Sequence, residues 1–335
     1  LVGPISDTYG RRPVLLIGLL LMALGVLGSG VAWSYGSLLA TRLISGIGSA
    51  MLPPTIMAAL ADNLPPEKVG KSVGFITSSS WVGVALGVPA IALLGYIGGW
   101  RLPFYITGGL SLVLWVPLYL CLPKGQRLLG QRIDIINRFK VIGRQPGPWY
   151  VLIANTAQQA TLLGLMTYFA AYMIEGYGWD EANTAPGLAL LGVGAVIGSF
   201  AGGVLAGRTR SLEWLAAISL AGGVVTGLLF ALDLSAWIVV AMAFVASVLV
   251  SVSMPVLMTL IMHLAGQSRG TAGGMFSTSN QAGGVVGASA GGLMLSLGGY
   301  SSVGLLYLVA AVLSASVIGI IMRRSPAFRL IGTGT

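Results

Sequence analysis

The chain has 335 residues, of which 56% are hydrophobic and 8% charged, and its formal net charge is +9. A soluble domain carries about a quarter charged residues, so this composition excludes a soluble globular protein and predicts an all-α polytopic membrane protein. The single cysteine, Cys121, excludes an intrachain disulfide and a thiolate metal site, and we expect neither a metal nor another cofactor.

The first segment, Gly3–Pro13, reads G-P-I-S-D-T-Y-G-R-R-P and separates a few apolar residues from a long apolar run. Its two glycines and two prolines predict a loop. It carries one acid, Asp7, and two adjacent bases, Arg11 and Arg12. Two interpretations are open: the arginines are only topology charges of a membrane loop, or they form a charge latch with Asp7.

Apolar runs long enough to cross a membrane as helices follow one another along the chain. A hydrocarbon layer about 30 Å thick needs about 20 apolar residues in helical form. Ten complete spans are predicted, near 13–32, 36–60, 72–97, 103–122, 149–174, 184–206, 213–231, 236–262, 274–297 and 303–322.

One break between the runs is longer than the others and divides the chain. It carries six lysines and arginines, and it separates four predicted spans from six. The predicted domains are therefore 1–122, an incomplete N-terminal bundle, 123–148, a basic cytoplasmic linker, and 149–335, a C-terminal six-helix bundle.

The basic side chains fall on alternate loops and predict the orientation of the chain. The loops on the other side carry Arg101 together with acids such as Glu175 and Asp233. By the positive-inside rule the basic side is cytoplasmic, so both ends of this chain are predicted to lie on the cytoplasmic side. The membrane that we expect is a bacterial inner membrane. The positive charge is then explained by topology and the lipid bilayer, so no nucleic-acid partner is expected.

The two halves match each other at a fixed offset of 200 residues. Gly70 aligns with Gly270 and Gly74 with Gly274, and further glycines align through the two predicted spans that follow. Such parallel repeats are typical of transporters built from two similar halves. A six-span second half implies a six-span first half, so we expect a preceding piece with one helix and most of another.

Arg42 lies inside the predicted span 36–60. An arginine within a membrane span normally faces a cavity or a partner. Gly46 and Ser49 share its helix face. The alternative is that the side chain extends to the outer interface, because Arg42 lies only a few residues into the span.

The run 81–99 combines glycines with a proline inside one predicted span. Gly83 and Gly87 provide a smooth face for close helix packing, and Pro89 removes a backbone hydrogen bond and can kink the helix. Both features suit a helix that moves against its neighbours, and both also suit tight packing alone.

Several polar side chains lie within the apolar runs of the second half. Each can hydrogen-bond a substrate or a neighbouring helix, so a substrate path and interhelical contacts are both open interpretations. No predicted span holds a clear central acid, and charges such as Asp62 are interpreted as loop surface charges. The residues predicted to line a substrate path are Asn155, Gln158, Tyr172, Asn280 and Gln281.

Three of these segments resemble motifs of the major facilitator superfamily. The first segment is similar to the loop G-x-x-x-D-x-x-G-R-R/K, the segment at Arg42 to R-x-x-x-G-x-x-x-A, and the run 81–99 to the antiporter motif. In the last, the proline comes one residue late and a closing glycine pair is replaced. The residues that the resemblance assigns are Gly3, Asp7, Gly10, Arg11 and Arg12 to gating, Arg42 to proton coupling, and Gly83, Gly87 and Pro89 to the antiporter helix.

The resemblance implies a fold of two pseudo-symmetric helix bundles and a secondary active transporter, not an enzyme. It favours the drug or metabolite:proton antiporters, with export of a small organic compound coupled to protons. Two alternatives stay open, a proton-coupled uptake symporter and a transport-inactive scaffold. Neither the substrate nor the oligomeric state follows from the sequence.

Overall fold

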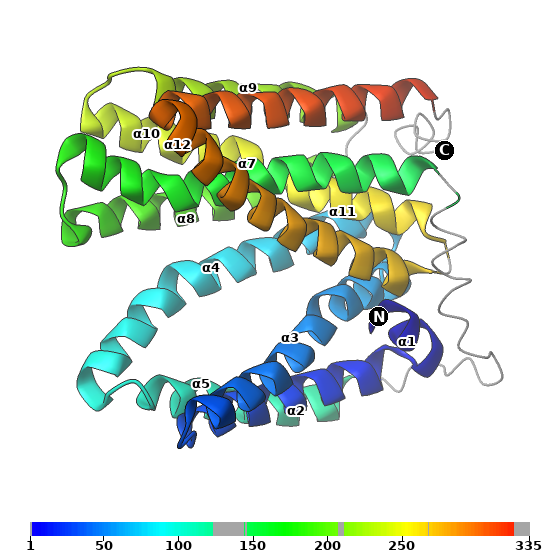
Figure 1. The fold of residues 1–335 in the computed structure, drawn as a ribbon. Coiled ribbons are helices and arrows are strands. Elements are labelled where there is room, and N and C mark those ends of the chain that lie inside the picture. The colour runs from blue at the N-terminus through cyan, green and yellow to red at the C-terminus, as the bar shows by residue number, and fades with distance from the viewer. Residues whose placement is uncertain (1, 123–143, 145, 207–210, 267, 325–335) are drawn as a thin grey trace. The chain divides into compact units, whose positions relative to one another are not determined.

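The computed structural model describes residues 2–122, 144, 146–206, 211–266 and 268–324, and in that part of the chain it consists of helices and short turns (Figure 1). Each predicted span coincides with helix to within a few residues. The helices are α1 (Val2–Tyr9), α2 (Arg11–Gly30), α3 (Tyr35–Asn63), α4 (Pro66–Gly98), α5 (Leu102–Cys121), α7 (Pro146–Tyr177), α8 (Glu181–Ala206), α9 (Ser211–Ala231), α10 (Ala236–Ser251), α11 (Ser253–Leu264) and α12 (Arg269–Arg324).

Seven helical segments of the described residues are long and apolar enough to cross a membrane, and α10 and α11 together form one of them, Ala236–Leu264. The predicted count of ten complete spans is not confirmed, for two reasons. Helices α4 and α7 are not among the seven, and α12 counts once although it covers two predicted spans. Inside α12 the backbone leaves helical geometry at Gly298 and Gly299, between those two spans, and Gly299 has a φ of +69°.

The loop predicted for Gly3–Pro13 is wrong in its detail, because residues Val2–Tyr9 form helix α1. The turn is confined to Gly10, whose φ of +92° is a conformation that glycine adopts without steric cost. Pro4 and Pro13 fall within the first turn of α1 and of α2, where a proline does not interrupt a helical hydrogen bond. The prolines therefore accompany helix starts instead of breaking the helices.

The chain divides into two compact units that are described separately. Unit 1 comprises Leu1–Asn63, Leu86–Arg144 and Ala265–Gly274, and unit 2 comprises Leu64–Ala85, Gln145–Leu264 and Met275–Thr335. Helices α4 and α12 each contribute to both units. The linker predicted at 123–148 lies almost entirely outside the described residues, and the bundle boundaries stay a prediction.

In unit 1, helix α2 packs on α3 and α5 through glycines. A Cβ on Gly25 would lie 2.7 Å from the carbonyl oxygen of Thr41, and one on Gly18 would lie 3.1 Å from that of Gly48. On the α5 side, a Cβ on Gly108 would lie 2.6 Å from Leu27 Cγ. These backbone approaches are typical of membrane helices. Such helices associate through close packing of small residues, because lipid provides no hydrophobic driving force between them.

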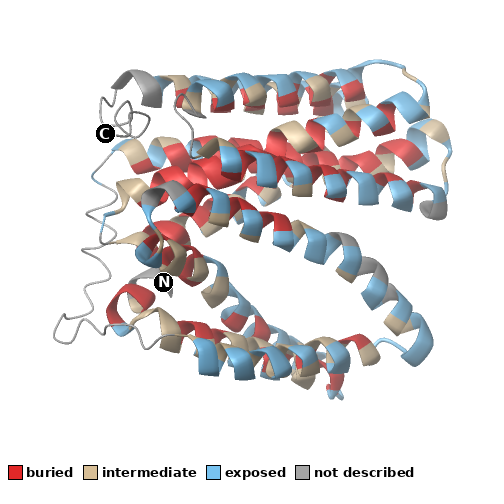
Figure 2. Cartoon of the chain, turned by 180° about the vertical axis from the view of Figure 1, so that it is seen from behind, coloured by how far each residue is buried: buried red, intermediate tan, exposed pale blue. Residues whose placement is uncertain are grey.

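In unit 2, buried residues are most frequent on α7, α10 and α11 (Figure 2). The largest side chains of this core include Phe169, Tyr172, Phe230 and Tyr307. The Tyr172 ring centroid lies 5.4 Å from that of Phe230 and 4.7 Å from that of Tyr300. Phe230 lies on α9, and Tyr300 and Tyr307 lie on α12, so aromatic packing holds α7, α9 and α12 together at the end where α7 finishes.

The predicted repeat is visible in two corresponding contacts. In unit 2, a Cβ on Gly70 would lie 2.8 Å from the Ala206 Cβ, and in unit 1 a Cβ on Gly270 would lie 2.6 Å from the Ser6 Oγ. The two contacts are related by the 200-residue offset, Gly70 with Gly270 and Ala206 with Ser6. The two halves thus share a way of packing as well as a glycine pattern.

Candidate gating site at the start of helix α12

The Asp7 carboxylate in unit 1 lies against the N-terminus of α12. Its Oδ1 accepts a hydrogen bond from the Gly270 N–H at 2.9 Å, and its Oδ2 accepts from the Thr271 N–H at 3.1 Å and from the Thr271 hydroxyl at 3.0 Å. The first N–H groups of a helix have no partner within the helix, and an anion there is stabilised by the helix dipole. Asp7 is 6% exposed, so it supplies a nearly buried charge that this helix start favours.

Arg11 balances that charge. Its Nη1 donates to Asp7 Oδ1 at 2.6 Å and to Ser6 Oγ at 2.7 Å. Asp7 and Arg11 are four residues apart, but α1 ends at Tyr9 and α2 begins at Arg11. The turn at Gly10 therefore brings the guanidinium back over α1.

A second acid extends the network to α3. Asp62 Oδ2 accepts from Arg11 Nε at 3.0 Å, and Asp62 Oδ1 accepts from Arg269 Nη1 at 3.0 Å. Arg269 also donates to the Ala61 carbonyl oxygen at 2.5 Å. We call these residues, Ser6, Asp7, Arg11, Asp62, Arg269, Gly270 and Thr271, the Asp7 network.

The Asp7 network joins three segments that are far apart in sequence. It contains two acids and two arginines, so their formal charges cancel. Helix α12 continues beyond Gly274 into unit 2. A hydrogen bond to a charged group contributes about 1.5–3 kcal/mol net, so a few such bonds can hold a helix end in one position and still be broken.

Arg12, which was predicted to act with Arg11, is directed elsewhere. Its Nη2 donates to the Tyr119 carbonyl oxygen at 2.7 Å, and its guanidinium lies 5.4 Å from the Tyr119 ring centroid. It therefore attaches α2 to α5. Of the two motif glycines, Gly10 forms the turn after α1, and Gly3 lies within α1.

Arg42 has an exposed side chain near the start of α3. Its guanidinium lies 4.4 Å from the Phe104 ring centroid on α5. A Cβ on Gly46, one turn further on the same face, would meet nothing within 4 Å. The predicted proton-coupling role stays a prediction.

The predicted glycine face of α4 does not make close contacts in this structure. A Cβ on Gly83 or Gly87 would meet no described atom within 4 Å, and the side chain of Pro89 lies outside the described residues. Close packing occurs earlier in the helix, where Gly74 meets Gly203 of α8 and a Cβ on either would lie 2.5 Å from the other's Cα.

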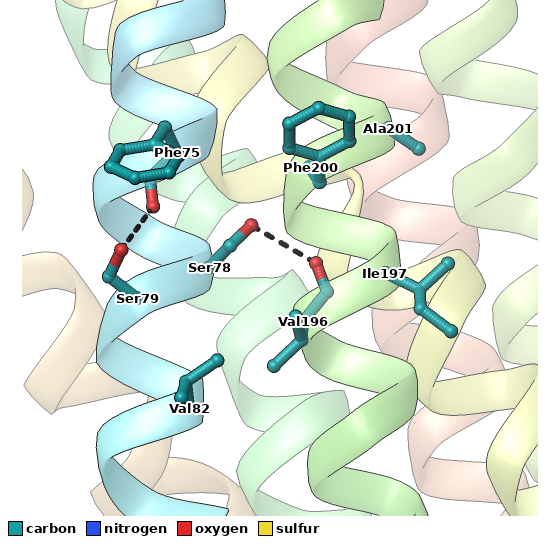
Figure 3. A pocket seen from close by; sticks show the side chains of 8 residues that line it. All are labelled: Phe75, Ser78, Ser79, Val82, Val196, Ile197, Phe200 and Ala201. Atoms are coloured by element: carbon teal, nitrogen blue, oxygen red, sulfur yellow. Dashed lines mark hydrogen bonds between the residues drawn. The ribbon is translucent and has the colours of Figure 1, made fainter.

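Beyond that glycine contact, α4 and α8 form the walls of a groove in unit 2 (Figure 3). Its volume is about 550 Å³. One hydrogen bond crosses it, from the Ser78 hydroxyl to the Val196 carbonyl oxygen at 3.0 Å. The groove is apolar, and its lining is formed by Phe75, Ser78, Ser79, Val82, Val196, Ile197, Phe200 and Ala201.

Two of the five predicted substrate-path residues, Asn155 and Asn280, hydrogen-bond between α7 and α12 inside unit 2. Asn155 Nδ2 donates to Ser279 Oγ and to Asn280 Oδ1, both at 2.7 Å, and Gln159 Nε2 donates to Asn280 Oδ1 at 3.0 Å. Asn155 is fully buried, and Gln158 is 1% exposed. The arrangement favours interhelical hydrogen bonding over an open path for Asn155 and Asn280. The buried Gln158 amide, in contrast, has no hydrogen-bond partner among the described residues.

The other two predicted path residues differ in exposure. Tyr172 is buried in the aromatic core, and its hydroxyl lies 3.5 Å from that of Tyr177. Gln281, in contrast, is exposed on α12. Only Gln281 and the half-buried Asn280 therefore present polar atoms that a substrate could reach in this conformation.

Sequence reasoning missed Asp62 and the first residues of α12 as members of the gating site. Asp62 looked like a loop charge, and Arg269 looked like a topology charge. One signal was present, since the repeat aligns Gly270 with Gly70 and marks both as close-contact positions. The partners themselves are separated from Asp7 by more than 50 residues, which spacing along one helix does not reveal.

Comparisons with known proteins agree on one family. A family model described as Major Facilitator Superfamily matches residues 1–288. The inner membrane transport protein YdhP of Escherichia coli O157:H7 is 25% identical over 94% of this chain and 80% of its own length. Multidrug resistance protein 1 of Bacillus subtilis (strain 168) is 25% identical over 89% of this chain and 77% of its own length.

The fold has close counterparts among solved structures. The crystal structure of the major facilitator transporter FucP in the outward conformation covers all of this chain with a TM-score of 0.77 and 16% identity, and the match covers 86% of that protein. At this level of identity the likeness concerns the fold alone.

Proposed function

The chain belongs to the major facilitator superfamily, and from this membership we propose that it exports a small organic compound in exchange for protons by alternating access. It is an integral membrane protein, and its bacterial relatives include an inner membrane transport protein. Export is supported by the likeness to multidrug resistance protein 1 of Bacillus subtilis, and a bacterial inner membrane location by the likeness to YdhP.

The single observation that carries the mechanism is the Asp7 carboxylate on the N-terminus of α12. Alternating access needs a contact that is stable in one state and broken in the other. A balanced group of charges at the start of a helix that continues into unit 2 meets that need. In this proposal the Asp7 network closes one side of the protein, which the positive-inside rule makes the cytoplasmic side.

Two further parts complete the mechanism. Arg42 assists proton handling from within α3, because a guanidinium at membrane depth favours a nearby anion and disfavours a nearby proton. Helix α4 bends or slides at Gly83–Pro89, where Gly83 and Gly87 have free space in this conformation. The contact between Gly74 and Gly203 would then hold the other end of α4 against α8.

The direction of proton movement is tested in energised everted membrane vesicles that contain the full chain. The vesicle interior is acidified, the proton gradient is followed by quenching of an acridine dye, and ethidium, norfloxacin or benzoate is added. Exchange for protons releases protons and restores fluorescence, whereas symport does not. Vesicles without the protein are the control, and the absence of any compound-dependent recovery contradicts proton-coupled export of these compound classes.

A further inference from the structure

Two arginines and two aromatic rings form a continuous stack in unit 1, at the end where α3 and α5 begin. The Arg42 guanidinium lies 4.4 Å from the Phe104 ring centroid, and Phe104 meets Trp100 edge-on at 6.1 Å with an interplanar angle of 78°. Arg101 lies 4.3 Å from the Trp100 ring centroid. We call Arg42, Phe104, Trp100 and Arg101 the arginine–aromatic stack.

Arg42 lies within the apolar helix Tyr35–Asn63, which is long enough to cross a membrane. Trp33 and Tyr35, at the start of α3, are 84% and 81% exposed, as expected of aromatic residues in an interfacial belt. Arg42 is seven residues beyond Tyr35, which places its Cα about 10 Å along the helix axis. An arginine at that depth requires water or an anion, because hydrocarbon does not solvate its charge.

No anion from the protein meets that requirement among the described residues. The described acids of unit 1, Asp7 and Asp62, are both engaged in the Asp7 network. Arg101 is held by a hydrogen bond from its Nη2 to the Ala32 carbonyl oxygen at 3.2 Å. Within the described chain, Arg42 has the Phe104 ring as its neighbour and neither an ion pair nor a hydrogen bond from its guanidinium.

The stacking geometry suits a planar anion. The Arg42 guanidinium lies over the Phe104 ring and makes no hydrogen bond to the described chain, so its N–H donors are available for bidentate pairing with a carboxylate. Trp100 is half exposed and Phe104 is partly exposed, so ring surface lies beside the charge. A single molecule that carries both a carboxylate and an aromatic ring satisfies both surfaces.

We propose that the arginine–aromatic stack is a binding site for small aromatic carboxylates, with the carboxylate on Arg42 and the ring against Trp100 and Phe104. The proposal rests on the proposed function, because it assigns a substrate class to the transporter. A phosphate headgroup of a lipid would satisfy the charge of Arg42 but would leave the ring surfaces unused.

The test is equilibrium binding of radiolabelled benzoate to the purified full chain in detergent. We expect saturable binding that Arg42→Gln weakens at least tenfold and that Arg42→Lys weakens less, because the charge is kept. Lys71→Gln, which removes an exposed cation on α4 outside the stack, should change binding by less than threefold. Thermal unfolding of each variant confirms that the protein is folded. Competition with 3-phenylpropionate, cyclohexanecarboxylate, inorganic phosphate and phosphatidylglycerol defines the ligand class.

Three results would overturn the proposal: no saturable benzoate binding, binding that Arg42→Gln leaves unchanged, or displacement by phosphate or phosphatidylglycerol as effective as by 3-phenylpropionate. The last result would identify a general anion or lipid site. Binding is measured without a membrane gradient, so its failure is distinct from failure of transport. Proton exchange with ethidium but no benzoate binding rejects the site alone, and benzoate binding without any proton exchange rejects the proposed export alone.

Discussion

Replacing Asp7 by asparagine removes the charge that faces the start of α12 while keeping the shape of the side chain. The carboxylate accepts hydrogen bonds from backbone N–H groups at 2.9 and 3.1 Å and from Arg11 at 2.6 Å. An asparagine amide has one oxygen for these donors, and its NH₂ group would face another donor. The substitution therefore leaves at least one buried donor without an acceptor.

The size of the effect follows from these contacts. A hydrogen bond to a charged group contributes about 1.5–3 kcal/mol, and a carboxylate at a helix N-terminus contributes about 0.3–2 kcal/mol. Some of this loss is recovered by the amide oxygen, so we expect Asp7→Asn to shift the balance between the closed and open network by about 2–3 kcal/mol. Such a shift increases the open fraction roughly 30- to 150-fold.

Cysteine alkylation measures that fraction. Ala272, in the first turn of α12, has no exposed surface, so the thiol introduced by Ala272→Cys reacts only when the network opens. Cys121 is exposed and is replaced by serine beforehand. We expect the rate of reaction with N-ethylmaleimide to rise roughly 30- to 150-fold in the Asp7→Asn background.

The matched control is Asp180→Asn in unit 2. Asp180 also serves a helix start, where its Oδ1 accepts from the Asn183 N–H at 2.7 Å before α8. This substitution removes the same chemical group from a different helix, so the alkylation rate at position 272 should not change. An equal rate in the Asp7→Asn and Asp180→Asn proteins would refute the reasoning.

Three further substitutions test other contacts. Gly270→Ala places a Cβ 2.5 Å from the carboxylate of the Asp7 network, so alkylation of the Ala272→Cys thiol should accelerate at least tenfold, and an unchanged rate would disprove the close contact. Gly74→Val should lower the unfolding temperature in detergent, because overpacking costs about 1–3 kcal/mol. Gly83→Val is the control, since a side chain there has free space and should not lower the temperature. Equal unfolding temperatures of the two variants would contradict the contact between Gly74 and Gly203. Asn155→Ala should cost about 1–3 kcal/mol of stability, because it removes hydrogen bonds between α7 and α12. Gln281→Ala, at an exposed position, should not. Equal stabilities of the two variants would contradict the interhelical role of Asn155.

The positions of the helices could be predicted from the sequence because a long run of apolar residues identifies a membrane helix. The runs 36–60 and 103–122 lie within a few residues of the observed helices. The loop expected at Gly3–Pro13 could not be excluded in the same way. A proline in the first turn of a helix and a proline in a loop look alike in sequence, and only the positive φ of Gly10 marks the true turn.

The candidate site was predictable only in part. The Asp7–Arg11 pair follows from a recurring motif, but Asp62 and Arg269 join it through contacts across more than 50 and more than 200 residues. Helical spacing placed Asn155 and Gln158 on one polar face. It did not reveal that α12 covers this face, because spacing defines a face and not its neighbour.

The central claim is that the Asp7 network opens and closes during transport. The most direct measurement is compound-dependent proton release in everted vesicles, compared between the wild-type chain and Asp7→Asn at equal amounts of folded protein in the membrane. We predict saturable proton release for the wild type and at least a tenfold loss for Asp7→Asn. Undiminished proton release by the Asp7→Asn protein would contradict the account.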